Sequence, residues 1–249
     1  MTKPLTGKVA LVTGGSRGLG AATAKALAEQ GADVVISYVH AELKAHAVID
    51  YVVSQGVRGA AIQADQADGT AVQMLIDSII AKFGRLDIVI NNASIDEMGT
   101  VDDPQRDNRA FDRFWAVAMT GLTATVRAAS KVLSDHGRIV MVGSNLGSRV
   151  GVPGLSDLAA VKGAIDGYSR GVARDLAPRS ITVNVVHAGF MKTDINAHMR
   201  DGLAPLIERL CFPRFGLLEE VVAPILFLAS PAASYITGTS IDADGGYNA

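Results

Sequence analysis

The chain has 249 residues, of which 49% are hydrophobic and 19% are charged, and its formal net charge is −2. This size and composition fit one globular domain with a large core, and the near-neutral charge argues against a nucleic-acid or anionic-membrane partner. The single cysteine excludes an internal disulfide, and no apolar run approaches the ~18 residues that a membrane span requires. We therefore expect a soluble cytoplasmic protein.

Short apolar runs rich in β-branched residues alternate with longer helical segments along the chain. In order, we predict strand Val9–Thr13, helix Gly20–Gln30, strand Asp33–Tyr38, helix Ala41–Ser54, strand Gly59–Ala64, helix Gly69–Phe83, strand Leu86–Asn91, helix Phe111–Leu133, strand Arg138–Val142, helix Leu158–Leu176, strand Ile181–Val186, helices Leu203–Leu210 and Glu219–Leu228, and strand Ser240–Asp244. The strands are continuously apolar, as is typical of parallel strands buried on both faces. The pattern predicts a single-domain α/β fold with a doubly wound parallel sheet of about seven strands.

Ligands of such a sheet bind beyond the carboxyl ends of the strands, where the strand order reverses. The turn after the first strand carries Gly14, Gly18 and Gly20, whose spacing lets backbone N–H groups approach a pyrophosphate. The helix that follows directs its positive N-terminus at the same anion. A glycine-rich turn without a ligand is the alternative, but its place in the first βαβ unit favours dinucleotide binding.

The residues after the second strand indicate which dinucleotide binds. Ser37-Tyr38-Val39-His40 contains no carboxylate that would hydrogen-bond an unphosphorylated ribose. Arg17, within the glycine-rich turn, can hold a 2′-phosphate as a bidentate donor, and a solvent-facing side chain is its alternative. Both observations favour NADP(H) over NAD(H).

Further residues complete a family pattern. The segments Thr13-Gly14-x-x-x-Gly18-x-Gly20, Asn91-Asn92-Ala93, Ser144, Lys162 and Asp244-Gly245-Gly246 resemble, in order and spacing, the short-chain dehydrogenase/reductase family. The resemblance covers Gly7 to Gly246 and is greatest to the 3-oxoacyl-carrier-protein reductase-like branch. It implies a Rossmann-like fold and hydride exchange between NADP(H) and a carbonyl carbon.

The resemblance also implies a role for each matching residue. Ser144 hydrogen-bonds the substrate carbonyl, Lys162 grips the nicotinamide ribose, Asp65 contacts the adenine and Thr193 holds the nicotinamide carboxamide. The complete set expected at the cofactor is Gly14, Ser16, Arg17, Gly18, Leu19, Gly20, Tyr38, Asp65, Gln66, Asn92, Ala93, Lys162, Gly189 and Thr193.

The pattern breaks where a proton donor is expected. The family usually carries a tyrosine four residues before the lysine, whose charge lowers the phenol pKa, and this chain has Leu158 there. The asparagine of the family's central helix maps onto Ala118, and Asn-Asn-Ala-Gly ends here in Ser94. Tyr168 follows Lys162 by six residues and is predicted to lie on another helix face, in the core.

Several groups are candidate replacements for the phenol. Asp157, beside the vacant position, comes first, with a helix N-cap or a solvent-facing side chain as its alternative. The other candidates, each with a structural alternative, are Asp96, Glu97, His187 and a water molecule held by Ser144 and Lys162. A predicted substrate lid at 196–215, together with Ala118 and Leu158, favours a hydrophobic or aromatic substrate, although ordinary core packing fits equally.

The leading hypothesis is an NADPH-dependent carbonyl reductase acting on a hydrophobic or aromatic small molecule or acyl substrate. Ser144, Lys162 and Asp157 are its predicted catalytic residues, with no metal. The alternatives are a non-redox isomerase, dehydratase or cyclase on the same scaffold, or an inactive NADP(H)-binding protein. Because family members commonly associate through their long helices, a homodimer or homotetramer is expected.

Overall fold

The computed structural model describes residues 3–193 and 200–249. Its centre is a seven-stranded sheet in the order β3-β2-β1-β4-β5-β6-β7, in which every pairing is parallel. The strands are β1 Val9–Val12, β2 Asp33–Tyr38, β3 Gly59–Gln63, β4 Leu86–Asn91, β5 Leu133–Ser144, β6 Thr182–Ala188 and β7 Ser240–Ala243. The order reverses between β1 and β4, as the doubly wound prediction requires, and the predicted fold is confirmed.

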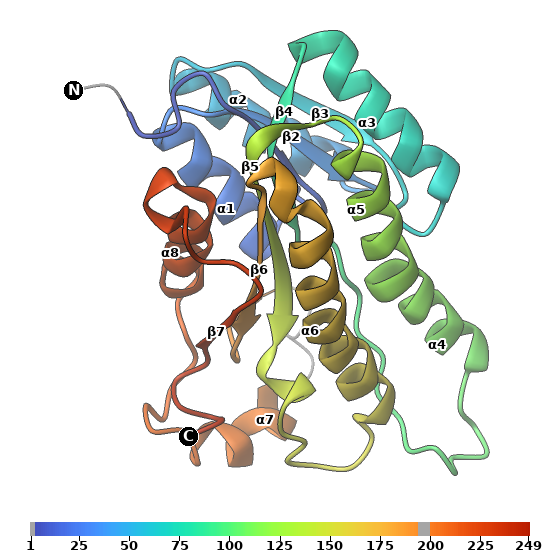
Figure 1. Cartoon of the computed structure of the whole chain (residues 1–249). Coiled ribbons are helices and arrows are strands. Elements are labelled where there is room, and N and C mark those ends of the chain that lie inside the picture. The colour runs from blue at the N-terminus through green and yellow to red at the C-terminus, as the bar shows by residue number, and fades with distance from the viewer. Residues whose placement is uncertain (1–2, 194–199) are drawn as a thin grey trace.

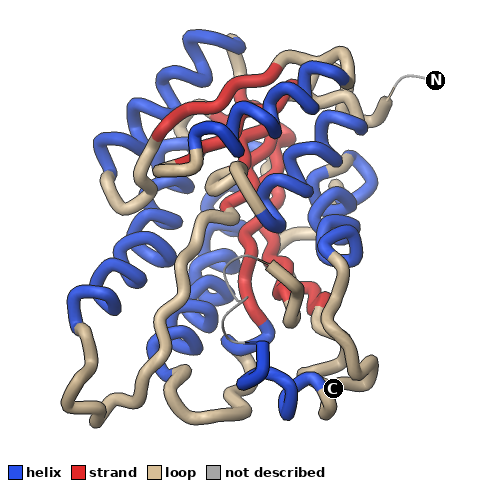
Figure 2. Tube along the Cα trace, turned by 180° about the vertical axis from the view of Figure 1, so that it is seen from behind, coloured by secondary structure: helices blue, strands red, loops and turns tan. Residues whose placement is uncertain are grey.

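Helices cover both faces of the sheet (Figures 1 and 2). One face carries α1 Gly18–Glu29, α2 Glu42–Ser54 and α8 Leu218–Ala229; the other carries α3 Gly69–Phe83, α4 Asn108–Trp115, α5 Leu122–Ser130 and α6 Ser156–Leu176. Alternate residues of β1 enter opposite cores, Ala10 and Val12 on the first face and Val9 and Leu11 on the second. Among the described residues, no helix has the length and apolar character to cross a bilayer.

The helix predicted over Phe111–Leu133 is confirmed as an unbroken helical stretch over residues 108–130, but its predicted end is wrong. A π-helical turn at Ala116–Gly121 separates α4 from α5, and Leu133 is the first residue of β5, where it pairs with Leu86. A Cβ on Gly121 would collide with the backbone of Gln66, so this turn lies directly against the segment after β3. The spacing of apolar residues in the sequence cannot reveal the extra residue of a π-helical turn. It also cannot show where a helix gives way to a strand within a continuous apolar run.

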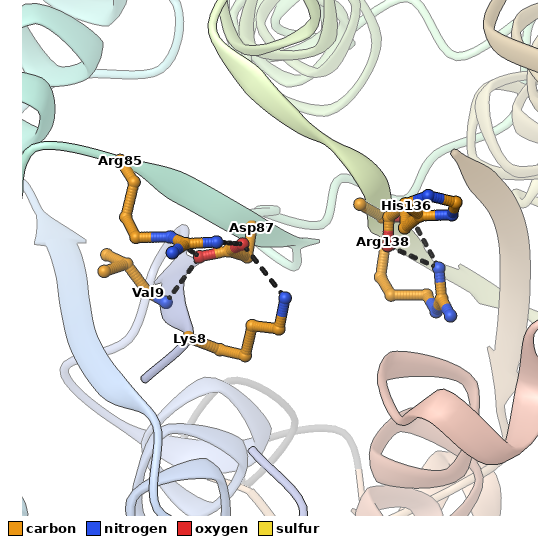
Figure 3. Close-up of polar contacts among 7 residues, drawn as sticks. Lys8, Val9, Arg85, Asp87, His136 and Arg138 are labelled. Atoms are coloured by element: carbon orange, nitrogen blue, oxygen red, sulfur yellow. Dashed lines mark hydrogen bonds and ion pairs between the residues drawn. The ribbon is translucent and has the colours of Figure 1, made fainter. Parts of the chain in front are cut away.

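A polar cluster ties β1 to β4 at the amino end of the sheet (Figure 3). The Asp87 carboxylate accepts hydrogen bonds from Val9 N at 3.0 Å, Arg85 Nη2 at 2.6 Å and Lys8 Nζ at 3.4 Å. Burial opposes ionisation of this carboxyl, but these donors outweigh burial and hold the Asp87 pKa below its usual value. The buried charge is therefore satisfied at the end of the sheet opposite to the candidate site.

Candidate active site

A cavity of about 640 Å³ lies at the carboxyl ends of the strands. Its wall includes the residues that follow each of β1 to β6, which is where a doubly wound sheet binds ligands. All of the residues predicted for the cofactor contribute to this wall, and Ser144 does so as well. Asp157, the third predicted catalytic residue, does not.

The turn between β1 and α1 has the geometry that an anion requires. Gly14 and Gly18 have φ angles of +64° and +53°, in the left-handed region that favours glycine. A Cβ on Gly20 would collide with the Gly14 carbonyl oxygen, so the third glycine allows α1 to pack closely on the turn. Helix α1 has no side-chain cap and no acidic residue in its first turn. Its first N–H groups are therefore available to a phosphate.

Hydrogen bonds fasten this turn to the segment after β4. Asn92 Nδ2 donates to Thr13 O at 2.9 Å and to Gly14 O at 3.3 Å. Thr13 Oγ1 accepts from the backbone N–H groups of Asn92 and Ala93, both at 3.0 Å. Hydrogen bonds therefore hold the segments after β1 and β4 together at the point where the strand order reverses. Asn92 and Ala93 both make these bonds and line the cavity.

The cavity wall extends to the carboxyl end of β2. Arg17, Tyr38 and His40 line the cavity, and residues 37–41 at the end of β2 contain no carboxylate. The Asp65 carboxylate accepts from Arg113 Nη2 at 2.7 Å, and although burial opposes ionisation, that bond and the one from Ala67 N lower its pKa. Arg113 was missed by sequence reasoning, because nothing in helix α4 signals that it reaches a residue 48 positions earlier.

Lys162 and Ser94 are in contact at the cavity wall. The Lys162 side chain is 7% exposed, and its Nζ donates to Ser94 Oγ at 3.2 Å. Burial lowers the Lys162 pKa, and the negative charge of Asp96 opposes that shift. The sequence marked Ser94 as a departure from the family pattern but gave no indication of this contact.

The Ser144 hydroxyl is held at the end of β5. It donates to Asn145 Oδ1 and accepts from Leu146 N, each at 3.2 Å. Both neighbours line the cavity, so this hydroxyl lies at the wall with its orientation set by local partners.

Leu158 and Ala118 form one apolar cluster with Phe114 and Val161. Leu158 is 6% exposed and lines the cavity. Ala118 is 2% exposed and does not reach the cavity wall, because it is covered by its cluster neighbours. Of the two predicted contributors to an apolar pocket, only Leu158 lies at its surface.

The Asp157 carboxylate is held by two donors and does not line the cavity, and its predicted catalytic role stays a prediction. The carboxylate accepts from Trp115 Nε1 at 3.0 Å and from Arg106 Nη2 at 2.8 Å. The Trp115 hydrogen bond lowers the Asp157 pKa, burial opposes this shift, and the Arg106 hydrogen bond adds to the lowering. A general acid must be protonated near the working pH, and a lowered pKa does not favour that state.

The other candidates are placed as follows. His187 is 2% exposed, its Nε2 lies 3.2 Å from Asp166 Oδ1, and it does not line the cavity. Tyr168 packs against the core on the α6 face, as predicted. Asp96 lines the cavity, whereas Glu97 does not.

The predicted lid is described only in part, since residues 196–199 lie outside the described residues. Helix α7 Arg200–Ile207 contributes Leu203 and Leu206 to the cavity wall. Leu206 also packs in a buried cluster with Phe190 and Tyr247, so apolar lining and core packing coexist. The apolar wall residues outside the glycine-rich turn include Ile95, Met98, Leu146, Val152, Leu155, Leu158, Leu203 and Leu206.

Comparison with known proteins places this geometry in a family. A family model described as enoyl-(acyl carrier protein) reductase matches residues 14–248. The versicolorin reductase of Emericella nidulans is 40% identical over a 255-residue alignment that covers 97% of this chain and 96% of the relative. The 3-oxoacyl-[acyl-carrier-protein] reductase of Synechocystis is 38% identical over 248 residues, 97% of either chain.

A similar solved structure is that of a short-chain dehydrogenase from Burkholderia cenocepacia in complex with NADP. It shares 42% identity with this chain and has a TM-score of 0.94, covering 99% of this chain and 100% of its own. Both sequence relatives are oxidoreductases by name. The chain belongs to the short-chain dehydrogenase/reductase family.

Proposed function

We propose that the protein is an NADPH-dependent carbonyl reductase whose proton donor is not a tyrosine. The observation that carries this proposal is that Ser144 and Lys162 line the same cavity as the glycine-rich turn. The names of the sequence relatives, both reductases, and the NADP held by the Burkholderia protein support the assignment.

The cradle fits the dinucleotide. Positive φ angles at Gly14 and Gly18 and the uncapped start of α1 present backbone N–H groups to a pyrophosphate. Arg17 would hold the 2′-phosphate, since no carboxylate at the end of β2 competes for the ribose. When bound, NADPH supplies the hydride for a carbonyl carbon.

Side chains of the protein would polarise the substrate carbonyl and bind the nicotinamide end of the cofactor. The Ser144 hydroxyl would turn from Asn145 Oδ1 to donate to the carbonyl oxygen, where negative charge grows as hydride arrives. Lys162 would hold the nicotinamide ribose and add positive charge to the same region. Thr193, whose Cγ2 would lie 3.9 Å from a Cβ built on Gly18, would hold the carboxamide from a position next to the phosphate turn.

The apolar wall sets the substrate class. Leu158, Leu155 and Leu203 line the cavity that Ser144 and Lys162 share, so a hydrophobic or aromatic ketone, or an acyl chain bearing a keto group, fits. The segment 200–215 then serves as part of a substrate lid. Cytoplasmic location and a homo-oligomer joined through α5 and α6 complete the proposal.

The test is NADPH oxidation at 340 nm against a panel of aromatic and aliphatic ketones. We expect turnover of the larger apolar members, and a loss of about 10²-fold in kcat for Ser144→Ala, the size seen when one oxyanion donor is removed. Substrate turnover without an absorbance change would instead indicate a non-redox enzyme. Tight NADPH binding with no turnover, unaffected by Ser144→Ala, would indicate a binding protein.

A further inference from the structure

A buried lysine normally requires a partner for its charge, and here that partner is a serine hydroxyl. Lys162 is 7% exposed, and its Nζ donates to Ser94 Oγ at 3.2 Å. The position one helical turn earlier, Leu158, offers no polar atom. The polar contact of Lys162 is therefore directed to the segment after β4 instead of along its own helix.

Ser94 and the predicted carbonyl-binding residue Ser144 both lie at the carboxyl edge of neighbouring parallel strands. Asn91 at the end of β4 pairs with Met141 of β5. Ser94 and Ser144 each lie three residues beyond these partners, so they leave neighbouring parallel strands at the same edge. Both line the cavity. Both hydroxyls therefore belong to the one cavity that a substrate carbonyl would enter.

The Ser94 hydroxyl has one proton to donate and lone pairs to accept another, as a group that passes protons from Lys162 to a substrate requires. The hydroxyl accepts from Lys162 Nζ and donates to Ile95 O at 3.1 Å, a local contact that a hydroxyl can exchange for a substrate oxygen by rotation. Burial lowers the Lys162 pKa, which makes its ammonium group a stronger acid than an exposed lysine. The acidic candidate next to Leu158, Asp157, lies outside the cavity wall.

Resting on the proposed reductase function, we propose that Ser94 and Lys162 together are the proton donor. As the carbonyl carbon accepts hydride, its C=O π pair moves to oxygen, and that oxygen takes the proton from Ser94 Oγ. The serine O–H bond breaks while a Lys162 N–H bond breaks to restore it. The neutral amine then takes a proton from water entering the cavity, so one hydride and one solvent proton are consumed per alcohol formed.

Ser94 is the residue to change, because Lys162 is also expected to hold the cofactor. Ser94→Ala should lower kcat for a ketone substrate about 10²-fold, the lower end for removal of a general acid, with the NADPH dissociation constant unchanged. Ser94→Thr keeps the hydroxyl and should retain most of the parent kcat. In a Leu158→Tyr background the phenol supplies the proton, so Ser94→Ala should there cost far less.

A second measurement does not depend on the double variant. Single-turnover rates in mixtures of light and heavy water should curve with deuterium content for the parent, because the Ser94 O–H and a Lys162 N–H transfer together. For Ser94→Ala the dependence should be linear.

The outcomes separate the two proposals. A parent enzyme that turns over ketones while Ser94→Ala keeps its kcat would overturn the relay and leave the reductase intact. Equal losses from Ser94→Ala in both backgrounds would assign the serine a structural role and also overturn it. A parent that never oxidises NADPH would refute the reductase function itself.

Discussion

Replacing Leu158 with tyrosine tests whether the reacting end of the cavity accepts a conventional proton donor. Leu158 lies one helical turn before Lys162, so the two side chains project from the same face of α6. Leu158 lines the cavity and is packed on its other sides by Phe114, Ala118 and Val161. A phenol introduced there points its ring into this cluster and its hydroxyl towards the cavity.

The expected gain is a difference between two effects. A positioned general acid contributes about 10²–10⁴-fold to the rate. The cluster is packed around a leucine, and a larger ring there costs about 1–3 kcal/mol in strain. If this strain displaces the phenol from the reacting oxygen, the rate falls by about one to two powers of ten, at 1.36 kcal/mol per tenfold. Because the proposed Ser94–Lys162 donor already serves the parent, only the advantage of the phenol over that donor would appear, and we expect kcat for simple ketones to rise about tenfold.

The control is Leu158→Phe, which carries the same ring without the hydroxyl. NADPH oxidation at 340 nm is compared for the two variants at saturating NADPH, with the dissociation constant of NADPH measured for each. Phenylalanine should give no gain, because only steric effects remain. If Leu158→Tyr is no faster than Leu158→Phe while both bind NADPH as the parent does, the reasoning about this end of the cavity is refuted.

Three further variants test other parts of the structure. Arg17→Ala should raise the KM for NADPH about tenfold to 10²-fold and change that for NADH little, since a charge-assisted bond to phosphate is worth about 1.5–3 kcal/mol; equal effects on both would remove Arg17 from the 2′-phosphate site. Asp87→Asn should lower the free energy of unfolding by about 2 kcal/mol at neutral pH. Because the folded-state pKa of Asp87 is lowered, its contribution to the free energy of unfolding is complete above the unfolded pKa of about 3.9 and is lost as the pH falls through the folded-state pKa. The free energies of unfolding of parent and variant, measured in urea, should therefore converge in acid. Asp157→Asn should leave kcat unchanged and cost about 1 kcal/mol of stability, and a large fall in kcat would return Asp157 to the catalytic group.

The part of the cavity wall formed by the glycine-rich turn was predictable because its determinants are local. Gly14, Gly18 and Gly20 mark a turn whose backbone angles and close packing few other residues allow, and their place after the first strand fixes where they lie in the sheet. The parallel order of strands then brings Asp65 and Thr193 to the same cavity without knowledge of any side-chain contact.

The surroundings of the candidate proton donors were not predictable, because they depend on contacts between distant segments. Asp157 adjoins Leu158 in sequence, but consecutive helical residues differ by about 100°, so the two face different surroundings. Its partners, Trp115 and Arg106, are 42 and 51 residues away and carry no mark of this role. The contact between Lys162 and Ser94 spans 68 residues and is equally invisible to local patterns.

Ala118 and Leu158 are chemically matched. Position 118 lies within a π-helical turn and is enclosed by Phe114, Leu158 and Val161, so an amide there would be buried among apolar side chains. An unpaired buried amide costs about 1–3 kcal/mol, a penalty that a phenol at position 158 could relieve but a leucine cannot. The two apolar residues are therefore one structural unit, and a proton path through this side of the helix is closed. Beside Lys162 of α6, polar groups at this part of the cavity are supplied by Ser94, which follows β4, and by Ser144, which ends β5.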